Sequence, residues 1–164
     1  MNSVYLLLGS NINDRQKMIR LAIDEISSRV GTIGQSSSLY ESEPWGFTAD
    51  QDFLNQVIRV ETMLSPTKLL EEILDIEISL GRTRMENEQG YASRSIDIDI
   101  LFYNNEIIRE EHLDIPHPKI HERLFTLVPL CELDESFIHP VHCKSLGELM
   151  AICPDKNAVV PYKV

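Results

Sequence analysis

The sequence contains no hydrophobic run long enough to cross a membrane. The longest apolar run near its start, Val4 to Leu8, is far too short for a transmembrane helix or for the core of a signal peptide. No basic segment precedes this run, as a signal peptide would require. We therefore expect a cytoplasmic protein with neither a leader nor a membrane anchor.

Cysteine is scarce, and its positions suggest no disulfide framework. Cys131, Cys143 and Cys153 are odd in number and lack Cys-x-x-Cys spacing, which favours free, reduced thiols. With His139 and His142 they raise the alternative of a zinc site. Because their spacings match no standard finger or ribbon, a solvated loop that contains histidines is the ordinary explanation.

Positive charge is also under-represented. The chain has 15 Lys and Arg against 26 Asp and Glu, a formal net charge of -11, which argues against a general DNA or RNA binder because such a surface repels phosphates. Basic residues nevertheless gather in the segments around one strand, at Arg82, Arg84, Arg94, Arg109, His112, His117, Lys119, His121 and Arg123. Two interpretations stay open: a local site for a polyanion and its metal, or a chance alternation of surface charges.

The length of 164 residues and the apolar content of 43% predict a single domain, residues 1–164. Hydrophobic periodicity and turn residues predict strands at 4–8, 53–62, 95–102 and 106–109, an extended segment at 36–42, and helices at 14–30, 65–80, 120–127 and from 145, with a break at 31–34. The order strand, helix, strand, strand, helix, strand is that of the ferredoxin-like split βαβ motif. We expect an α+β fold: a ferredoxin-like βαββαβ core with a C-terminal hairpin and helical extension, and helices on both faces of a mainly antiparallel sheet.

The strand predicted at 95–102 is the most informative segment. Its run of isoleucines reads as buried, yet it carries Asp97 and Asp99, which share one face with their Cα atoms about 6.6 Å apart, while Ile96, Ile98, Ile100 and Phe102 take the other face. Two neighbouring carboxylates require solvent or cations. The alternatives are an edge strand with one wet face and a divalent-metal site, since Mg²⁺ prefers carboxylate oxygens and shares them with phosphates.

Several motifs resemble one known family, the 6-hydroxymethyl-7,8-dihydropterin pyrophosphokinases of folate biosynthesis. They cover most of the chain to about residue 130, in the family's order and spacing. The motifs are Leu8-Gly9-Ser10-Asn11, Ser42-x-Pro44-x-Gly46, Phe53-Leu54-Asn55, Leu80-Gly81-Arg82-x-Arg84, Ala92-Ser93-Arg94-Ser95-Ile96-Asp97-Ile98-Asp99-Ile100-Leu101, Ile115-Pro116-His117-Pro118, Arg123-x-Phe125 and Pro129-Leu130.

The resemblance implies transfer of the β,γ-pyrophosphoryl group of ATP to the hydroxymethyl oxygen of the pterin, with release of AMP. It implies that Asp97 and Asp99 hold two Mg²⁺ ions and that Arg82 and Arg94 are the catalytic cations. The implied ATP contacts are Glu77, Arg84, Ile100, His112, His117 and Arg123. The implied pterin contacts are Ser42, Pro44, Trp45, Phe53, Asn55, Tyr91 and Phe125. The expected partners are these two small molecules, without nucleic acid or membrane, and a monomer is the working expectation.

Physical reasoning agrees with the implied pterin pocket. A flat, polar heterocycle is well held between aromatic faces such as those of Phe53 and Phe125, with an amide such as Asn55 at its edge. Ordinary core packing is the alternative for the two phenylalanines, but a buried Asn55 needs a polar partner. The segments 46–52 and 84–93 are expected to close over the ligands.

Two other functions remain alternatives at this stage. The same scaffold could bind a nucleotide or a pterin without catalysis, or it could be a two-metal phosphohydrolase. Retention of Arg82, Arg94, Asp97 and Asp99 argues against the first, because a simple binder needs no pair of metal ligands aimed at a triphosphate. Release of phosphate without an acceptor would identify the second.

Overall fold

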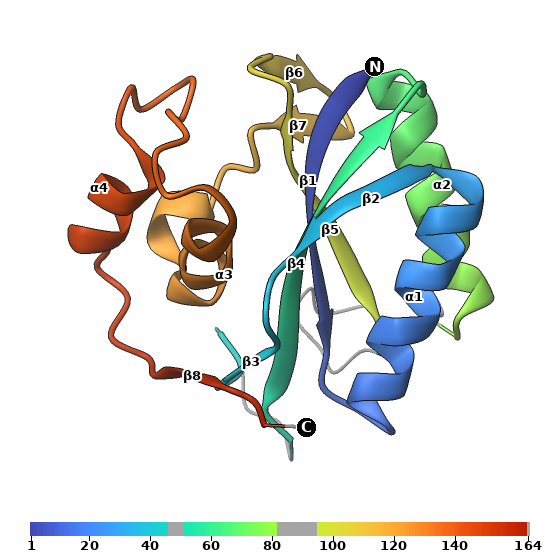
Figure 1. Cartoon of the computed structure of the whole chain (residues 1–164), viewed down its shortest axis with the longest axis horizontal. Helices are drawn as coiled ribbons and strands as arrows, with labels where there is room; N and C mark the ends of the chain where they lie inside the picture. Colours follow the sequence, from blue (N-terminus) through green and yellow to red (C-terminus); the bar gives the residue numbers. More distant parts are fainter. Residues whose placement is uncertain (46–50, 82–94, 164) are drawn as a thin grey trace.

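The computed structural model describes residues 1–45, 51–81 and 95–163, and shows an α+β fold (Figure 1). The elements within these ranges are β1 (Asn2–Ser10), α1 (Arg15–Arg29), β2 (Gly31–Ser36), β3 (Tyr40–Ser42), β4 (Phe53–Thr62), α2 (Pro66–Ser79), β5 (Asp97–Tyr103), β6 (Ile108–Glu110), β7 (Leu113–Ile115), the short 3₁₀ helix η2 (Ile120–Glu122), α3 (Leu124–Asp134), α4 (Leu146–Ala151) and β8 (Val159–Pro161).

One antiparallel sheet organises the molecule. Its strands lie in the order β5-β1-β4-β3-β8, and β2 pairs with the half of β4 that β3 leaves free. The order β5-β1-β4-β2 is the split βαβ arrangement expected from the sequence. The strands β6 and β7 form a separate hairpin. The predicted fold class is confirmed.

Helices cover both faces of the sheet (Figure 1). On one face, α1 and α2 bury a core that includes Leu6, Leu8 and Ile58; on the other, α3 and α4 enclose a second core that includes Leu7 and Val57. Neighbouring residues of β1 thus serve opposite cores, as the alternation of a strand requires. Burial on both faces explains why β1 reads as a continuous apolar run.

Side-chain caps fix where the helices begin. The Asp14 carboxylate accepts a hydrogen bond from the Lys17 amide at 3.1 Å, and the Ser65 hydroxyl accepts one from the Lys68 amide at 3.3 Å. Before α4, Ser145 and Glu148 exchange two hydrogen bonds of 3.1 Å each, which together form a capping box. These caps set the starts of α1, α2 and α4 close to the positions read from the sequence.

Several details differ from the sequence-based expectations. The sequence predicts a break at Gly31 and Gly34, but both residues belong to the strand β2. Gly31 pairs with Thr62 at a close approach, since a Cβ there would lie 2.0 Å from the Glu61 carbonyl oxygen. The helix expected at 120–127 is divided into η2 and α3. The edge strand β8 has no counterpart in the prediction.

Phe102 lies on the face opposite to the one expected. In the pairing of β1 with β5, Tyr5 lies opposite Phe102 but Leu6 lies opposite Ile100, so Leu101 is an extra residue that forms a bulge. The bulge reverses the alternation, and Phe102 packs in the core beneath α3 and α4, whereas Ile100 packs beneath α2. The expectation for Phe102 was wrong because strict alternation was assumed.

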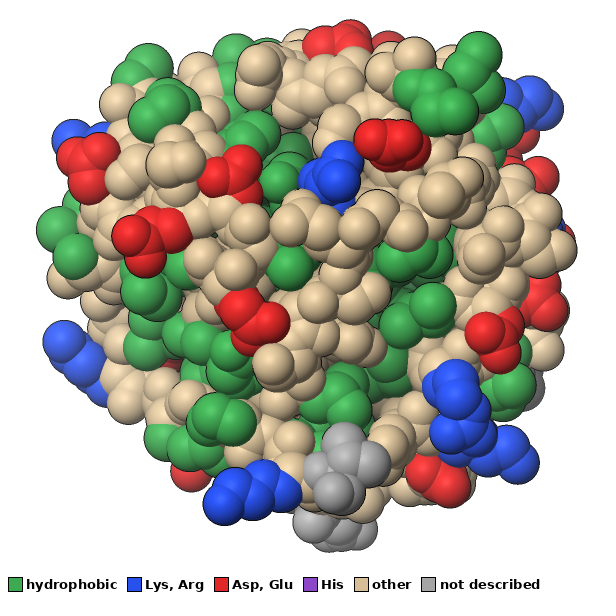
Figure 2. Space-filling view, viewed as in Figure 1, with side chains coloured by type: hydrophobic (Ala, Val, Ile, Leu, Met, Phe, Trp, Pro, Cys, Tyr) green, Lys and Arg blue, Asp and Glu red, His purple; other side chains and the backbone are tan. Residues whose placement is uncertain are grey.

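The surface carries charges of both signs. On the face shown in Figure 2, acidic and basic side chains are interspersed among hydrophobic ones, and neither sign forms a continuous patch. No helix within the described ranges has the length and hydrophobicity needed to span a bilayer.

Candidate active site

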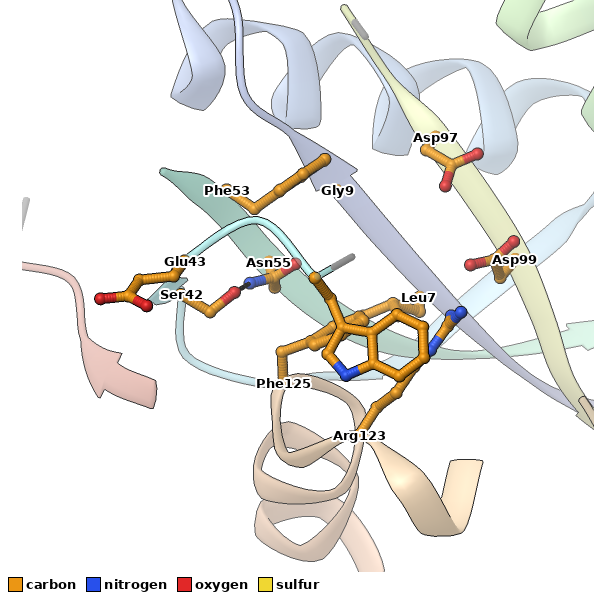
Figure 3. Close-up of a pocket in the computed structure, with 11 residues that line it drawn as sticks. Leu7, Gly9, Ser42, Glu43, Phe53, Asn55, Asp97, Asp99, Arg123 and Phe125 are labelled. Atoms are coloured by element: carbon orange, nitrogen blue, oxygen red, sulfur yellow. Dashed lines mark hydrogen bonds between the residues drawn. The ribbon is translucent and has the colours of Figure 1, made fainter. Parts of the chain in front are cut away.

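A pocket opens on the sheet face that α3 covers, where β1, β4 and β5 lie side by side (Figure 3). It contains carboxylates on one side and aromatic rings with an amide on the other. The lining residues are Leu7, Gly9, Ser42, Glu43, Trp45, Phe53, Asn55, Asp97, Asp99, Arg123 and Phe125.

Strand register brings these residues together. Gly9 of β1 pairs with Asn55 on one side and with Asp97 on the other, and Leu7 pairs with Asp99. Gly9 has no side chain, so no Cβ projects into the pocket between Asn55 and Asp97. The two aspartates share one face, as the sequence predicts, and both point into the pocket (Figure 3).

Asn55 is a buried amide with a defined orientation. It is 2% exposed, and its Nδ2 donates to the Ser42 hydroxyl at 2.8 Å and to the Tyr40 carbonyl at 3.4 Å. Both amide hydrogens point toward β3, so the Oδ1 faces the floor above Gly9, where it would lie 3.5 Å from a Cβ at that position. This amide therefore offers its oxygen, and Ser42 its hydroxyl, to a ligand in the pocket.

Arg123 lies among the aromatic rings of this pocket. Its guanidinium carbon is 4.6 Å from the centre of the Trp45 ring and 5.4 Å from that of Phe125. The residue is 9% exposed, and its Nε has no hydrogen-bond partner among the described residues. The sequence places Arg123 with the ATP contacts, whereas the structure places it beside the residues predicted to hold the pterin.

A second hollow lies on the far side of the aspartates, between β5, α2 and the segment 112–118. Four of the six predicted ATP contacts line it, together with both aspartates. Its lining residues are Leu70, Leu74, Glu77, Asp97, Ile98, Asp99, Ile100, His112, Leu113, Asp114, His117 and Pro118. Asp97 and Asp99 thus stand between two hollows and are accessible from each.

Glu77 and His117 have structural partners at this second hollow. Glu77, 2% exposed, accepts a hydrogen bond from the Ile98 amide at 2.8 Å and so anchors α2 to β5. The Nδ1 of His117 accepts one from the Lys119 amide at 3.1 Å. Burial, followed by the nearby Arg123 charge, lowers the pKa of His117 to about 4. The ring is therefore neutral at pH 7, with its proton on Nε2.

Some predicted residues lie outside the described part of the chain. These are Arg82, Arg84, Arg94 and Tyr91, together with residues 46–50 of the segment 46–52 and the whole of the segment 84–93. Pro44 is described and lies between the lining residues Glu43 and Trp45. His112 is largely exposed, with a side-chain exposure of 84%.

The prediction omitted Leu7, Gly9 and Glu43 from the pocket. The sequence predicts strands at 4–8 and 53–62, and pairing them would have placed residues near Leu7 and Gly9 beside Asn55.

The Asp97 and Asp99 carboxylates suit a hard divalent cation such as Mg²⁺. In the described ranges no three His, Cys, Asp or Glu side chains cluster tightly enough to hold a metal ion.

Comparisons with known proteins identify the family. The profile of the family described as 7,8-dihydro-6-hydroxymethylpterin-pyrophosphokinase (HPPK) matches residues 5–135. The chain is 40% identical over 148 residues to the 2-amino-4-hydroxy-6-hydroxymethyldihydropteridine pyrophosphokinase of Aquifex aeolicus, covering 90% of each protein. It is 42% identical over 133 residues to the protein of that name from Bacillus subtilis, covering 80% of this chain and 78% of the relative.

Solved structures show the same fold. The crystal structure of Plasmodium falciparum HPPK-DHPS with pterin and p-hydroxybenzoate superposes with a TM-score of 0.73 at 19% sequence identity. The match covers 92% of this chain and 41% of the Plasmodium chain, so the chain spans less than half of that larger protein. The profile match and the two bacterial relatives show that this chain belongs to the 7,8-dihydro-6-hydroxymethylpterin-pyrophosphokinase family.

Proposed function

We propose that this chain transfers the β,γ-pyrophosphoryl group of ATP to the hydroxymethyl oxygen of 6-hydroxymethyl-7,8-dihydropterin in folate biosynthesis. One observation carries the proposal beyond family membership. Asp97 and Asp99 stand between two hollows of different character, one aromatic with a buried amide and one lined by Glu77, Ile100 and His117. A two-substrate transfer requires such an arrangement, with the charged group of the donor next to the acceptor.

The aromatic pocket suits the acceptor. Phe53 and Phe125 supply ring faces for a flat heterocycle, and Asn55 and Ser42 supply an amide oxygen and a hydroxyl for its polar edge. Trp45 adds a further ring at the pocket wall. A pterin is both flat and rich in donors and acceptors, so these groups match it better than they match a purely apolar ligand.

The second hollow suits the nucleotide. The apolar side chains of Leu70, Leu74 and Ile100 offer a surface for a base, and the protonated Nε2 of His117 is a neutral donor for a phosphate oxygen. Since the pKa of His117 is about 4, this donor keeps its form across the physiological range. His112 lies at the same hollow and adds a second imidazole.

Asp97 and Asp99 would hold the magnesium ions. When bound, Mg²⁺ neutralises phosphate charge and makes the β-phosphorus a better electrophile. With two carboxylates from the protein, the remaining ligands would be water and phosphate oxygens, which is the usual composition of such sites. The number of ions, two, follows from the family resemblance.

The reaction depends mainly on the positioning of the two substrates and on the stabilisation of negative charge on the phosphates. The hydroxymethyl oxygen attacks the β-phosphorus, the bond from that phosphorus to the α,β-bridging oxygen breaks, AMP leaves with the bridging oxygen, and the hydroxyl proton passes to solvent. No strong general base is needed for a transfer of this type. Arg82 and Arg94, which lie outside the described residues, are proposed as cations at the transferred group, and Arg123 as a third cation near the acceptor.

The test is a product analysis. The protein is incubated with ATP, Mg²⁺ and 6-hydroxymethyl-7,8-dihydropterin, and nucleotides are separated by anion-exchange chromatography. We expect AMP and the pterin diphosphate in equal amounts, and no AMP when the pterin is left out. ADP or free phosphate as the main product would indicate a phosphohydrolase, and tight ATP binding without turnover would indicate a binding module; either result contradicts the proposal.

A further inference from the structure

The strand β3 supplies Ser42 to the acceptor pocket although it is only three residues long. Each of its residues is held by a side chain of a different element. The Tyr40 hydroxyl donates to Glu132 of α3 at 2.5 Å, Glu41 accepts from Arg15 of α1 at 2.6 Å, and Ser42 accepts from Asn55 of β4 at 2.8 Å. β3 pairs with β4 on one side and with β8 on the other, but over only three residues each, so these side chains add to the ladder in fixing where it lies.

Arg15, the first residue of α1, reaches two segments at once. Its Nη1 donates to the Glu41 carboxylate at 2.6 Å and to the Asp52 carbonyl at 2.8 Å. The guanidinium also lies 5.4 Å from the centre of the Tyr162 ring, and the side chain is only 11% exposed. A single shielded cation therefore joins Glu41, the central residue of β3, to the residue that precedes β4.

Both of these partners adjoin residues of the acceptor pocket. Glu41 precedes Ser42, Asp52 precedes Phe53, and Ser42 pairs with Phe53 in the ladder between β3 and β4. The side chains of Glu41 and Ser42 point to opposite faces of the sheet, since they are successive residues of a strand. Arg15 is not among the lining residues, so it acts on the pocket from behind, through the backbone.

We propose that Arg15 is a positioning residue for the pterin, an inference that rests on the function proposed above. By holding β3 against the start of β4, it reinforces the pairing of Ser42 with Phe53 and so the spacing between the Ser42 hydroxyl and the Phe53 ring. A pocket for a flat ligand depends on such spacing, because a displacement of about 1 Å in a positioning group is enough to weaken productive binding strongly. The nucleotide hollow, formed by α2, β5 and residues 112–118, does not depend on this contact.

The main variant is Arg15→Met, which keeps an unbranched apolar side chain and removes the charge and the hydrogen-bond donors. We expect the KM for the pterin to rise about tenfold or more, the equivalent of about 1.4 kcal/mol, while kcat and the KM for ATP stay within about twofold of the parent. Arg15→Lys retains a cation with several donors and should restore most of the pterin KM. Steady-state kinetics with each substrate varied in turn gives these values.

A matched control is available on the same helix. Arg29, in the last turn of α1, makes ion pairs with Glu72 and Asp75 of α2, far from β3. Arg29→Met should lower the melting temperature as Arg15→Met does, because both remove ion pairs, but it should leave the pterin KM unchanged. A merely structural role of Arg15 would make the two variants alike in kinetics.

A second variant tests the same inference if Arg15→Met does not fold. Glu41→Gln keeps the size and a weaker hydrogen bond, and we expect its pterin KM to rise about threefold, in the same direction as in Arg15→Met. Where Arg15→Met folds, the double variant with Glu41→Gln should show less than the sum of the single effects. An unchanged pterin KM in Arg15→Met and in Glu41→Gln, or equal increases for both substrates, would overturn the inference. Failure of the proposed function is distinct, since the parent protein would then form no AMP.

Discussion

Asp97 and Asp99 share a strand with isoleucines that are almost completely buried. Ile96, Ile98 and Ile100 have exposed fractions of 0%, 5% and 8%, whereas both aspartates line the two hollows. Strand alternation alone produces this separation, and it was readable from the sequence. The rigid strand fixes the carboxylates at the boundary between the proposed substrates, so their value to the protein is positional as well as electrostatic.

The first prediction concerns these carboxylates. Asp97→Asn and Asp99→Asn keep the side-chain shape but remove the charge that would hold a divalent cation. We expect kcat to fall by at least about a hundredfold in each variant, since electrostatic stabilisation of a charged transition state is of this size. The melting temperature should change little, because both side chains lie in a pocket rather than in a packed core.

Asp134→Asn is a suitable control for that experiment. Asp134 ends α3 over the same side of the sheet and lies outside both proposed substrate sites. The kcat of Asp134→Asn should equal that of the parent protein. If Asp97→Asn and Asp99→Asn also retained nearly normal turnover, the two aspartates would form a wet strand face and nothing more.

At the scale of elements, the sequence predicts best where the local signal is strong. The strand Phe53–Thr62 was predicted with its observed bounds because polar and apolar residues alternate in it, and α2 begins where Ser65 and Pro66 signal a helix start. Gly31 misled the prediction, because its role depends on a close approach to Glu61 that no local pattern reveals. The bulge at Leu101 and the pairing of β8 with β3 likewise depend on contacts between distant segments.

The second prediction tests the reason given for Gly31. In Gly31→Ala the added methyl would meet the Glu61 carbonyl oxygen at 2.0 Å, so β2 must separate from β4. We expect a loss of about 2 kcal/mol in the free energy of unfolding, which corresponds to a fall of roughly 4–8 °C in melting temperature. Thermal unfolding followed by circular dichroism measures it.

Gly34 provides the comparison for this effect. A Cβ at Gly34 would approach only the guanidinium of Arg59, at 2.7 Å, and the end of a long side chain can move aside. Gly34→Ala should therefore cost less than half as much stability as Gly31→Ala. Equal losses in the two variants would show that glycine's backbone freedom, rather than the close approach, is what β2 requires.

At the scale of the whole molecule, the candidate site is assembled from segments far apart in the sequence. The resemblance named most of the lining residues and divided them between two substrates, and the two hollows follow that division for Glu77, Ile100, His112 and His117 on one side and Ser42, Trp45, Phe53, Asn55 and Phe125 on the other. The resemblance also assigned Arg123 to the nucleotide, whereas its guanidinium stacks on Trp45 and Phe125. Such placement depends on how α3 docks on the sheet, which is a tertiary property that a residue's type and spacing do not encode.

The third prediction concerns the stability of the whole fold towards acid. Two histidines are held neutral in the folded state, each with a pKa of about 4: His117 at the second hollow and His139 near α4. Burial is the main cause for both. Nearby Arg123 and Lys119 add to it at His117, where Asp97 and Asp114 oppose it, and His142 and His121 add to it at His139. The His139 ring makes a T-shaped contact with Phe102, with ring centres 5.4 Å apart, and a tilted contact with His142, with ring centres 4.5 Å apart.

The sign of the effect follows from linkage. The unfolded chain binds a proton at each histidine with a pKa of about 6.5, and the folded chain does so only near 4. Their contribution to stability is therefore complete above pH 6.5 and is lost as the pH falls towards 4, at up to about 3 kcal/mol for each histidine. Urea unfolding at pH 7.5, 6.5, 5.5 and 4.5 measures this loss.

His139→Asn separates this contribution from that of the acidic residues. The Nδ1 of His139 accepts hydrogen bonds from the Val141 and His142 amides at 3.1 and 3.2 Å, and an asparagine oxygen can take over that role without titrating. Between pH 6.5 and 4.5 we expect the free energy of unfolding of the variant to fall less steeply than that of the parent. The two slopes should differ by the uptake of one proton, which is ~1.4 kcal/mol per pH unit. Parallel stability curves for parent and variant would show that His139 titrates alike in the folded and unfolded chains, and that the acid sensitivity of the fold arises elsewhere.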